Sequence, residues 1–163
     1  MNTKVTSLSK EDVAPIPPWM TPMVKSIMRW YSHYNTWIYQ KTGGKWGAKF
    51  PGGSPVCLIT MTGRKTGKKR TTPLIYVPNG EDVILVASQG GLDTHPLWYH
   101  NIVANPEVEV TVGKHTRSMV AHQADDEEKL TLWKVITGVH PDFNEYQART
   151  DRDIPVMVCQ PKK

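Results

Sequence analysis

Six short apolar runs, separated by turns rich in glycine, proline and asparagine, constrain the fold of this chain more than any other feature. Runs this short and rich in β-branched residues predict strands. The short connections between several of them are typical of antiparallel hairpins. We expect strands over residues 56–61, 70–77, 83–88, 107–112, 116–122 and 154–159. Together they predict an α+β protein, a six-stranded antiparallel β-barrel with peripheral helices.

One long helix and three shorter ones are expected around these strands. Over residues 22–41, apolar and aromatic side chains recur three and four residues apart, which predicts an amphipathic helix. Its aromatic face either packs on the rest of the protein or borders a ligand or lipid. The members of this face are Met23, Ile27, Trp30, Tyr31, Tyr34, Trp37 and Ile38. The shorter helices are expected over residues 96–104 (with Thr94 or His95 as N-cap), 125–138 and 141–149.

The chain reads as one domain preceded by a tail. Residues 1–20 are polar, mixed in charge and interrupted by prolines, which predicts a flexible N-terminal tail. Residues 21–161 contain no repeat or linker and predict a single domain. No stretch resembles a signal peptide or approaches the roughly 20 apolar residues of a transmembrane helix. We therefore expect a cytoplasmic protein, and contact of the 22–41 helix with the inner face of the cell membrane stays open.

Positive charge is concentrated in one short segment. The five cations found there alone equal the formal net charge of the whole chain, +5, so the remainder is neutral overall. A general affinity for polyanions spreads its charge over a face, whereas this pattern indicates one local anion site. The cations are Arg64, Lys65, Lys68, Lys69 and Arg70.

The segment over residues 63–68 looks like a phosphate loop but is not a Walker motif. Three residues separate Gly63 from Gly67 where that motif needs four, and Lys69 stands where it needs Ser or Thr. What remains is a glycine-flanked turn between two strands, whose backbone N–H groups and cations can hold an anion. The competing interpretation is a basic hairpin tip that keeps a strand edge soluble.

Other motifs give little support for chemistry independent of a cofactor. The six histidines form no pair with metal-ligand spacing, so we expect no metal site. Cys57 and Cys159 lie in separate apolar runs and predict buried structural thiols. The sequence Asp-Arg-Asp over residues 151–153 is typical of a local ion pair in a turn. An enzyme with this sequence has to take its chemistry from a cofactor.

Several blocks occur in a fixed order between residues 55 and 161, namely 61–74, 86–91, 96–101, 104–106, 146–152 and 154–155. Together they resemble the deazaflavin-dependent nitroreductase family of actinobacteria, the F420-dependent quinone reductases. The resemblance implies a split β-barrel like that of the FMN-binding, pyridoxamine-phosphate-oxidase-like proteins, which agrees with the barrel expected above. It also implies coenzyme F420, an 8-hydroxy-5-deazaflavin, as the cofactor.

The resemblance assigns residues of this chain to four parts of a coenzyme site. The phosphate of the coenzyme tail is assigned to Arg64, Lys65 and Thr66, with Arg70 beside them. The adjoining strand contributes Thr71, Thr72, Pro73, Leu74 and Ile75. Backbone and hydroxyl groups of Val86, Ala87, Ser88 and Gln89 meet the edge of the ring. Leu97, Trp98, Tyr99, His100 and Asn101 cover the ring.

The chain departs from the family pattern in two segments. Gln89 stands where a basic residue is common. The nitroimidazole-activating members carry three tyrosines where this chain has His140, Phe143 and Tyr146, which indicates a shifted choice of substrate. Tyr146 is the expected catalytic acid, with His140 as the runner-up. The competing interpretation of Tyr146 is a tyrosine that only packs its helix.

The resulting function hypothesis is transfer of a hydride from reduced F420 to a quinone or another activated conjugated acceptor. A second hypothesis keeps the coenzyme and takes unsaturated esters, lactones or lipids. A third is a non-enzymatic cofactor carrier or haem-binding barrel, with His100 or His140 as ligand. A nucleic-acid partner is not expected, because the charge lies in one loop and not along a face. The oligomeric state stays open.

Overall fold

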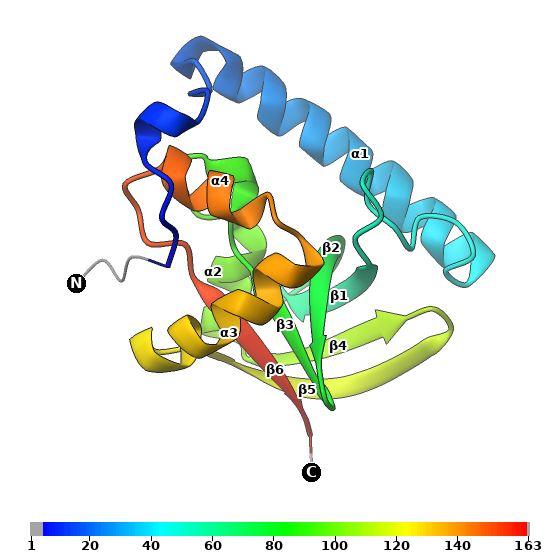
Figure 1. The fold of residues 1–163 in the computed structure, drawn as a ribbon. Helices are drawn as coiled ribbons and strands as arrows, with labels where there is room; N and C mark the ends of the chain where they lie inside the picture. The colour runs from blue at the N-terminus through cyan, green and yellow to red at the C-terminus, as the bar shows by residue number, and fades with distance from the viewer. Residues whose placement is uncertain (1–4, 163) are drawn as a thin grey trace.

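The computed structural model describes residues 5–162; residues 1–4 of the expected tail, and residue 163, lie outside the described part. Its strands are β1 (Val56–Thr62), β2 (Lys69–Asn79), β3 (Asp82–Val86), β4 (Glu107–Val112), β5 (His115–Gln123) and β6 (Val156–Pro161). They form a closed barrel in the order β1-β2-β3-β6-β5-β4, and every pair is antiparallel (Figure 1). The predicted six-stranded antiparallel barrel is confirmed.

Alternation along the strands separates the barrel interior from its outer faces. In β1, Cys57, Ile59 and Met61 point inward, whereas Val56 and Leu58 point outward. Cys159 joins the interior from β6, and both cysteines are free and buried. Burial raises the pKa of both thiols, that of Cys159 to about 12. They are structural groups, as expected.

The barrel opens along one edge of β2. Pairing with β3 covers only residues 76–79, whereas pairing with β1 covers residues 69–75. Tyr76 donates its N–H to the carbonyl oxygen of Pro55, on the β1 side. Because backbone groups alternate between the two edges of a strand, those of Thr71, Pro73 and Ile75 point to the opposite edge, which β3 does not pair. Pro73 has no N–H and suits such an edge.

Four α-helices surround the barrel: α1 (Thr21–Thr42), α2 (Leu97–Ala104), α3 (Asp126–Val139) and α4 (Phe143–Arg149). Three short 3-10 helices accompany them: η1 (Lys10–Asp12), η2 (Pro18–Met20) and η3 (Gln89–Gly91). Ile102 of α2 packs into the barrel interior, whereas Trp133 of α3 and Phe143 of α4 pack on the outward side chains of β3 and β6. α4 also lies beside η3 and the N-terminal segment (Figure 1).

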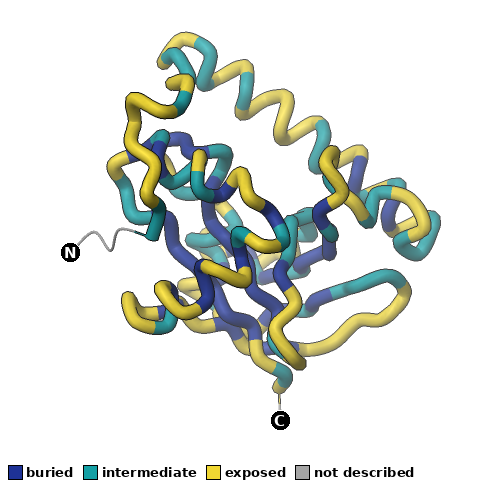
Figure 2. Tube along the Cα trace, in the orientation of Figure 1, coloured by how far each residue is buried: buried dark blue, intermediate teal, exposed yellow. Residues whose placement is uncertain are grey.

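Most of the aromatic face of α1 does not pack on the barrel; its members Tyr31 and Ile38 are half-buried, and Tyr31 contacts Phe50. Trp30, Tyr34 and Trp37 are exposed by 69%, 51% and 57%, and their rings follow one another along the helix. The buried residues of α1 are Asn35 and Tyr39, on another side of the helix, so most of α1 stays accessible (Figure 2). Within residues 5–162, no helix has the length and apolar character needed to cross a membrane.

The described part of the N-terminal tail touches α4 and the segment after it. Lys10 pairs with Asp151, and Arg149 Nε donates to the carbonyl oxygen of Ala14 at 3.0 Å. These contacts place η1 and Ala14 beside α4 and the segment after it, whereas η2 lies against α1. The flexibility expected for the tail stays a prediction.

Candidate functional site

The basic segment forms the tip of the β1–β2 hairpin. Gly63 donates its N–H to the carbonyl oxygen of Lys68, and Gly67, at a φ of +66°, donates to the carbonyl oxygen of Gly63, both at 2.8 Å. All five cations are exposed. Lys69 pairs with Glu109 at 2.8 Å, and no other cation of this segment has an ion pair among the described residues. The tip therefore presents a cluster of mostly unneutralised charge.

Asn101 joins this tip to α2. Its Oδ1 accepts the backbone N–H of Arg64 at 3.1 Å, and Asn105 Nδ2 donates to the carbonyl oxygen of Thr62 at 3.4 Å. The structure thus brings the expected phosphate residues beside the expected ring-covering residues, although 37 positions separate Arg64 from Asn101.

The first half of β2 lies beside both β1 and α1. Thr71 Oγ1 lies 2.8 Å from Thr60 Oγ1, and Thr72 Oγ1 lies 3.2 Å from Ser32 Oγ of α1. Leu74 packs into the barrel interior. The unpaired edge of β2 therefore runs from the basic tip along the strand that the resemblance assigned to the coenzyme, with α1 next to it.

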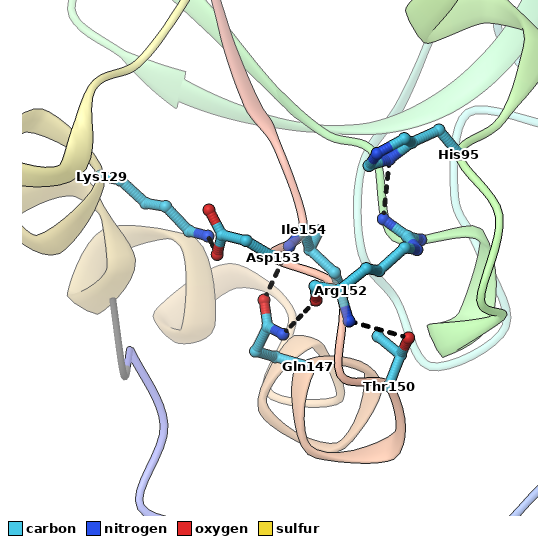
Figure 3. Close-up of polar contacts among 7 residues, drawn as sticks. All are labelled: His95, Lys129, Gln147, Thr150, Arg152, Asp153 and Ile154. Carbon is cyan, nitrogen blue, oxygen red and sulfur yellow. Dashed lines mark hydrogen bonds and ion pairs between the residues drawn. The ribbon is translucent and has the colours of Figure 1, made fainter. Parts of the chain in front are cut away.

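Arg152 organises the segment that leaves β3. Its Nη2 donates to the carbonyl oxygens of Ala87 at 3.1 Å and Ser88 at 2.6 Å, and its Nε donates to that of Leu92 at 2.7 Å. Its Nη1 lies 3.0 Å from Nδ1 of His95 (Figure 3). Burial lowers the pKa of Arg152 from its usual value. One guanidinium therefore holds four acceptors in place.

The prediction of a local ion pair within residues 151–153 is wrong. Arg152 points to carbonyl groups and His95, whereas Asp153 pairs with Lys129, a buried side chain of α3 (Figure 3). Asp151 pairs with Lys10. The three residues leave the turn in different directions because each has a partner on another element.

β3 and β6 are each shorter than expected at one end, because a side chain binds backbone groups that would otherwise continue the strand. β3 ends at Val86, not at residue 88, because Arg152 takes the carbonyl groups of Ala87 and Ser88. β6 begins at Val156, not at residue 154, because the side chain of Gln147 accepts the N–H of Ile154 and donates to the carbonyl oxygen of Arg152 (Figure 3).

The four residues assigned to the ring edge offer few free groups. Val86, Ala87 and Ser88 are buried. Ala87 donates its N–H to the carbonyl oxygen of Pro155 and gives its own carbonyl to Arg152. Gln89 has a φ of +49°, and its amide, oriented to satisfy both ends, donates to the carbonyl oxygens of Thr94 and His95. This segment is fixed by the protein itself.

α2 begins differently from the prediction. Its N-cap position is Pro96, and neither Thr94 nor His95 caps the helix. Leu97 is 78% exposed, whereas Trp98 and Tyr99 pack partly against the barrel core. Tyr99 donates its hydroxyl to Gln123 Oε1 on β5 at 2.8 Å. The rings of His95, Tyr99 and His100 form a cluster with centroid separations of 4.8–5.9 Å.

The two candidate acids lie on or next to α4. His140 is 4% exposed, and its Nδ1 lies 2.8 Å from Ser54 Oγ. Its Nε2 is buried without a hydrogen-bond partner among the described residues. Its ring contacts those of Phe143 and Tyr146. Burial lowers the pKa of His140 and raises that of Tyr146. At neutral pH both side chains are uncharged, so of the two only the phenol of Tyr146 remains in its acidic form.

Gly91 brings α4 against η3. A Cβ atom on Gly91 would lie 2.7 Å from the carbonyl oxygen of Tyr146 and 3.0 Å from Cβ of Arg149. Arg149 Nη1 also donates to the carbonyl oxygen of Gly90 at 2.9 Å. Tyr146 is thereby fixed next to the segment that Arg152 organises.

Arg152 and His95 are the residues of this region whose roles sequence reasoning missed. Arg152 stood between two aspartates, which is typical of an exposed turn. Its partners are backbone carbonyl groups, which carry no signal in a sequence. The one available signal was its place in the block over residues 146–152.

Comparisons with known proteins identify the family of this chain. The family model described as F420H(2)-dependent quinone reductase matches residues 30–161. The F420H(2)-dependent quinone reductase Rv1261c of Mycobacterium tuberculosis is 40% identical over 124 residues, which cover 74% of this chain and 83% of that protein.

Two solved structures are also similar. One, described as an F420-H2 dependent reductase (FDR-A), is 41% identical with a TM-score of 0.62, and covers 65% of this chain and 94% of its own. The other, described as a domain-swapped dimer, is 35% identical with a TM-score of 0.63, and covers 77% of this chain and 98% of its own. The chain belongs to the F420H(2)-dependent quinone reductase family.

Proposed function

We propose that this protein is an oxidoreductase that transfers a hydride from reduced coenzyme F420 to a quinone. The observation that carries the proposal is the cluster of exposed cations at the β1–β2 tip, next to the unpaired edge of β2 in a chain of this family. A coenzyme with a phosphate and several carboxylates in its tail fits this tip. Charge-assisted contacts to such groups are stronger than neutral hydrogen bonds.

The residues present fit the coenzyme. Arg64, Lys65, Thr66 and Arg70 lie at the tip and are exposed, so they can meet the anionic tail. The edge of β2 beyond them offers backbone groups that β3 does not use. When bound, the deazaflavin supplies a hydride, which removes the need for a metal or a nucleophilic side chain. The protein holds and orients both reactants, which reduces the entropic cost of their reaction.

We assign the proton that accompanies the hydride to Tyr146. Its raised pKa keeps the phenol protonated throughout the neutral range. His140 is less suited, because its lowered pKa leaves it uncharged at neutral pH and its ring is buried beneath Phe143 and Tyr146. Tyr146 is therefore the proposed catalytic acid and His140 a packing partner that orients its ring.

Tyr146→Phe tests this assignment, because it removes the hydroxyl and keeps the ring that packs on His140. A positioned acid typically contributes about 10²–10⁴-fold. We expect turnover with a quinone to fall at least about tenfold, with F420 binding unchanged. Glu145→Gln, at an exposed position on the same helix, is the control for helix disturbance. Turnover of Tyr146→Phe within twofold of the wild type would show that Tyr146 only packs and that the proton comes from water or His140.

Turnover itself tests the proposed function. Reduced F420 is mixed with the protein and a soluble quinone under anaerobic conditions, and oxidation is followed by the return of F420 absorbance. We expect catalysed oxidation with F420H2 and none with NADH under the same conditions. If F420H2 is oxidised no faster with the protein than without it, the proposal fails. Faster oxidation with an unsaturated ester than with any quinone would favour the second hypothesis, in which the acceptor is an unsaturated ester, lactone or lipid.

The exposed face of α1 supports a peripheral contact with the inner face of the membrane. Trp30, Tyr34 and Trp37 are exposed, and Lys25, Arg29 and Lys41 lie on the same helix. Aromatic rings beside cations suit an anionic lipid surface. The protein would then meet a lipid-soluble quinone at the membrane in which that quinone dissolves.

Co-sedimentation of the full chain with vesicles tests this contact. We expect pelleting with phosphatidylglycerol vesicles, weaker pelleting with phosphatidylcholine, and loss of pelleting in Trp30→Ser/Trp37→Ser. Leu130→Ser, which changes an exposed residue on α3, is the control. Absence of lipid-dependent pelleting in the folded wild type would end the idea.

A further inference from the structure

His95 lies between residues 86–89 and α2, the two parts of the chain that the resemblance assigned to the coenzyme ring. It follows η3 and directly precedes Pro96, the N-cap position of α2. Its side chain is partly exposed, and its ring contacts Tyr99 and His100 of α2. It is neither the helix cap that its position suggested nor a core residue.

Two side chains hold His95 in place from opposite ends. The amide of Gln89 donates to its backbone carbonyl oxygen at 3.2 Å. Nη1 of Arg152 lies 3.0 Å from its Nδ1. Gln89 stands where the family commonly has a basic residue, so this chain uses the position for an amide that binds the 94–95 loop. Arg152 in turn is fixed by the carbonyl groups of Ala87, Ser88 and Leu92.

The contact with Arg152 decides the protonation of His95. A guanidinium has only N–H donors, so it can approach Nδ1 at hydrogen-bond distance only when Nδ1 carries a lone pair. The ring is then neutral and carries its proton on Nε2. Burial and the nearby charges of Arg152 and His100 lower the pKa of His95, in agreement with a neutral ring.

A neutral imidazole with its tautomer fixed presents one defined donor. Tyr99 turns its hydroxyl away to Gln123, so it does not compete for an acceptor at this place. Among the described residues, the only hydrogen bond of the His95 ring is the one between Nδ1 and Arg152, so its Nε2–H is available as a donor at this end of α2.

We propose that His95 is a specificity-determining residue of the coenzyme site, whose Nε2–H donates to an oxygen acceptor of the bound deazaflavin ring. Arg152 is its positioning residue and acts by fixing the tautomer. The inference rests on the proposed function. Its ligand chemistry is a ring carbonyl or ionised hydroxyl oxygen, which distinguishes it from the phosphate and carboxylate groups assigned to the basic tip.

The first experiment measures the ring itself in the wild-type protein without coenzyme. Nitrogen-15 NMR of labelled histidine distinguishes a protonated from an unprotonated ring nitrogen. We expect His95 to show an unprotonated Nδ1 and a protonated Nε2 at pH 7. A proton on Nδ1 of His95 would overturn the inference, whatever the protein binds.

The second experiment measures F420 binding by fluorescence in three variants. His95→Leu removes the donor, His95→Gln keeps an N–H at similar reach, and His115→Leu is the control at an exposed strand end. We expect the dissociation constant to rise at least about tenfold in His95→Leu, to stay within about threefold of the wild type in His95→Gln, and not to change in His115→Leu.

Each outcome decides the inference. Unchanged binding by His95→Leu would overturn it, and so would an equal loss in His95→Leu and His95→Gln, because a ring that only packs gains nothing from an amide. If the wild type itself binds no F420, the proposed function fails, and the tautomer measurement still stands as a separate result.

Discussion

The basic tip over residues 63–70 and the segment over residues 86–92 are expected to bind the same coenzyme, but they are built in opposite ways. The tip is exposed, and among the described residues only Lys69 of its five cations has an acidic partner. The second segment is mostly buried, and the guanidinium groups of Arg152 and Arg149 hold its carbonyl oxygens. One region presents charge to solvent, and the other presents a fixed shape.

This difference teaches what each region can contribute. Exposed charges act over a distance, adapt to a flexible ligand and weaken as salt rises. A buried and fully bonded segment cannot adapt, so it favours one ring geometry and loses function when its support is removed. We therefore expect the tip to determine affinity and the second segment to determine stability and orientation.

Removal of Arg152 should give the largest effect. In Arg152→Met the carbonyl groups of Ala87, Ser88 and Leu92 lose their donor, and each buried unsatisfied group costs about 1–3 kcal/mol. A total of about 3 kcal/mol lowers Tm by roughly 6–12 °C in a chain of this length. The control is Lys68→Met at the exposed tip, expected to change the free energy of unfolding by about 0.5 kcal/mol or less. Equal Tm values for the two variants, by calorimetry, would remove the contrast between the regions.

A matched pair of glycines sharpens the comparison within the second segment. Gly91→Ala places a Cβ atom 2.7 Å from the carbonyl oxygen of Tyr146, so η3 and α4 have to move apart. Gly90→Ala has open space and meets only the strain of its φ of +67°, about 1–2 kcal/mol. We expect Gly91→Ala to lower both Tm and turnover clearly more than Gly90→Ala does. Equal losses would show that α4 does not depend on this contact.

At the tip we expect substitutions to weaken F420 binding and to leave Tm nearly unchanged. Lys65→Ala/Arg70→Ala removes two exposed cations, so the expected result is a rise of at least about tenfold in the F420 dissociation constant at low salt, from two contacts of roughly 1.5–3 kcal/mol each when well ordered. Tm should stay close to that of the wild type, because neither side chain is buried. Normal F420 binding by this double variant, at low salt, would contradict the assignment of the tip.

The same contrast explains which parts of the molecule the sequence could predict. The strands and the basic tip follow from local patterns: β-branched runs, turn residues and clustered charge are all visible in one stretch of chain. The antiparallel barrel follows from the short connections, whereas the pairing of β3 with β6 and of β1 with β4 joins strands distant in the sequence.

The network around Arg152 could not be predicted in this way. Its partners are backbone carbonyl groups 60 to 65 positions away, and a backbone acceptor looks the same in every residue. The surroundings of the aromatic face of α1 could not be predicted either. Its periodicity predicted the helix correctly, yet Asn35 and Tyr39 became the buried residues. Periodicity shows that a face exists but not what covers it.

Parallel titration of the purified protein with F420 and with FMN, read by fluorescence, tests the central claim most directly. Both molecules carry a tricyclic ring and a phosphate, but F420 adds several carboxylates. If the exposed tip binds that tail, F420 binds more tightly than FMN, and the advantage shrinks as salt rises. Equal affinity for the two molecules at low salt would contradict the account.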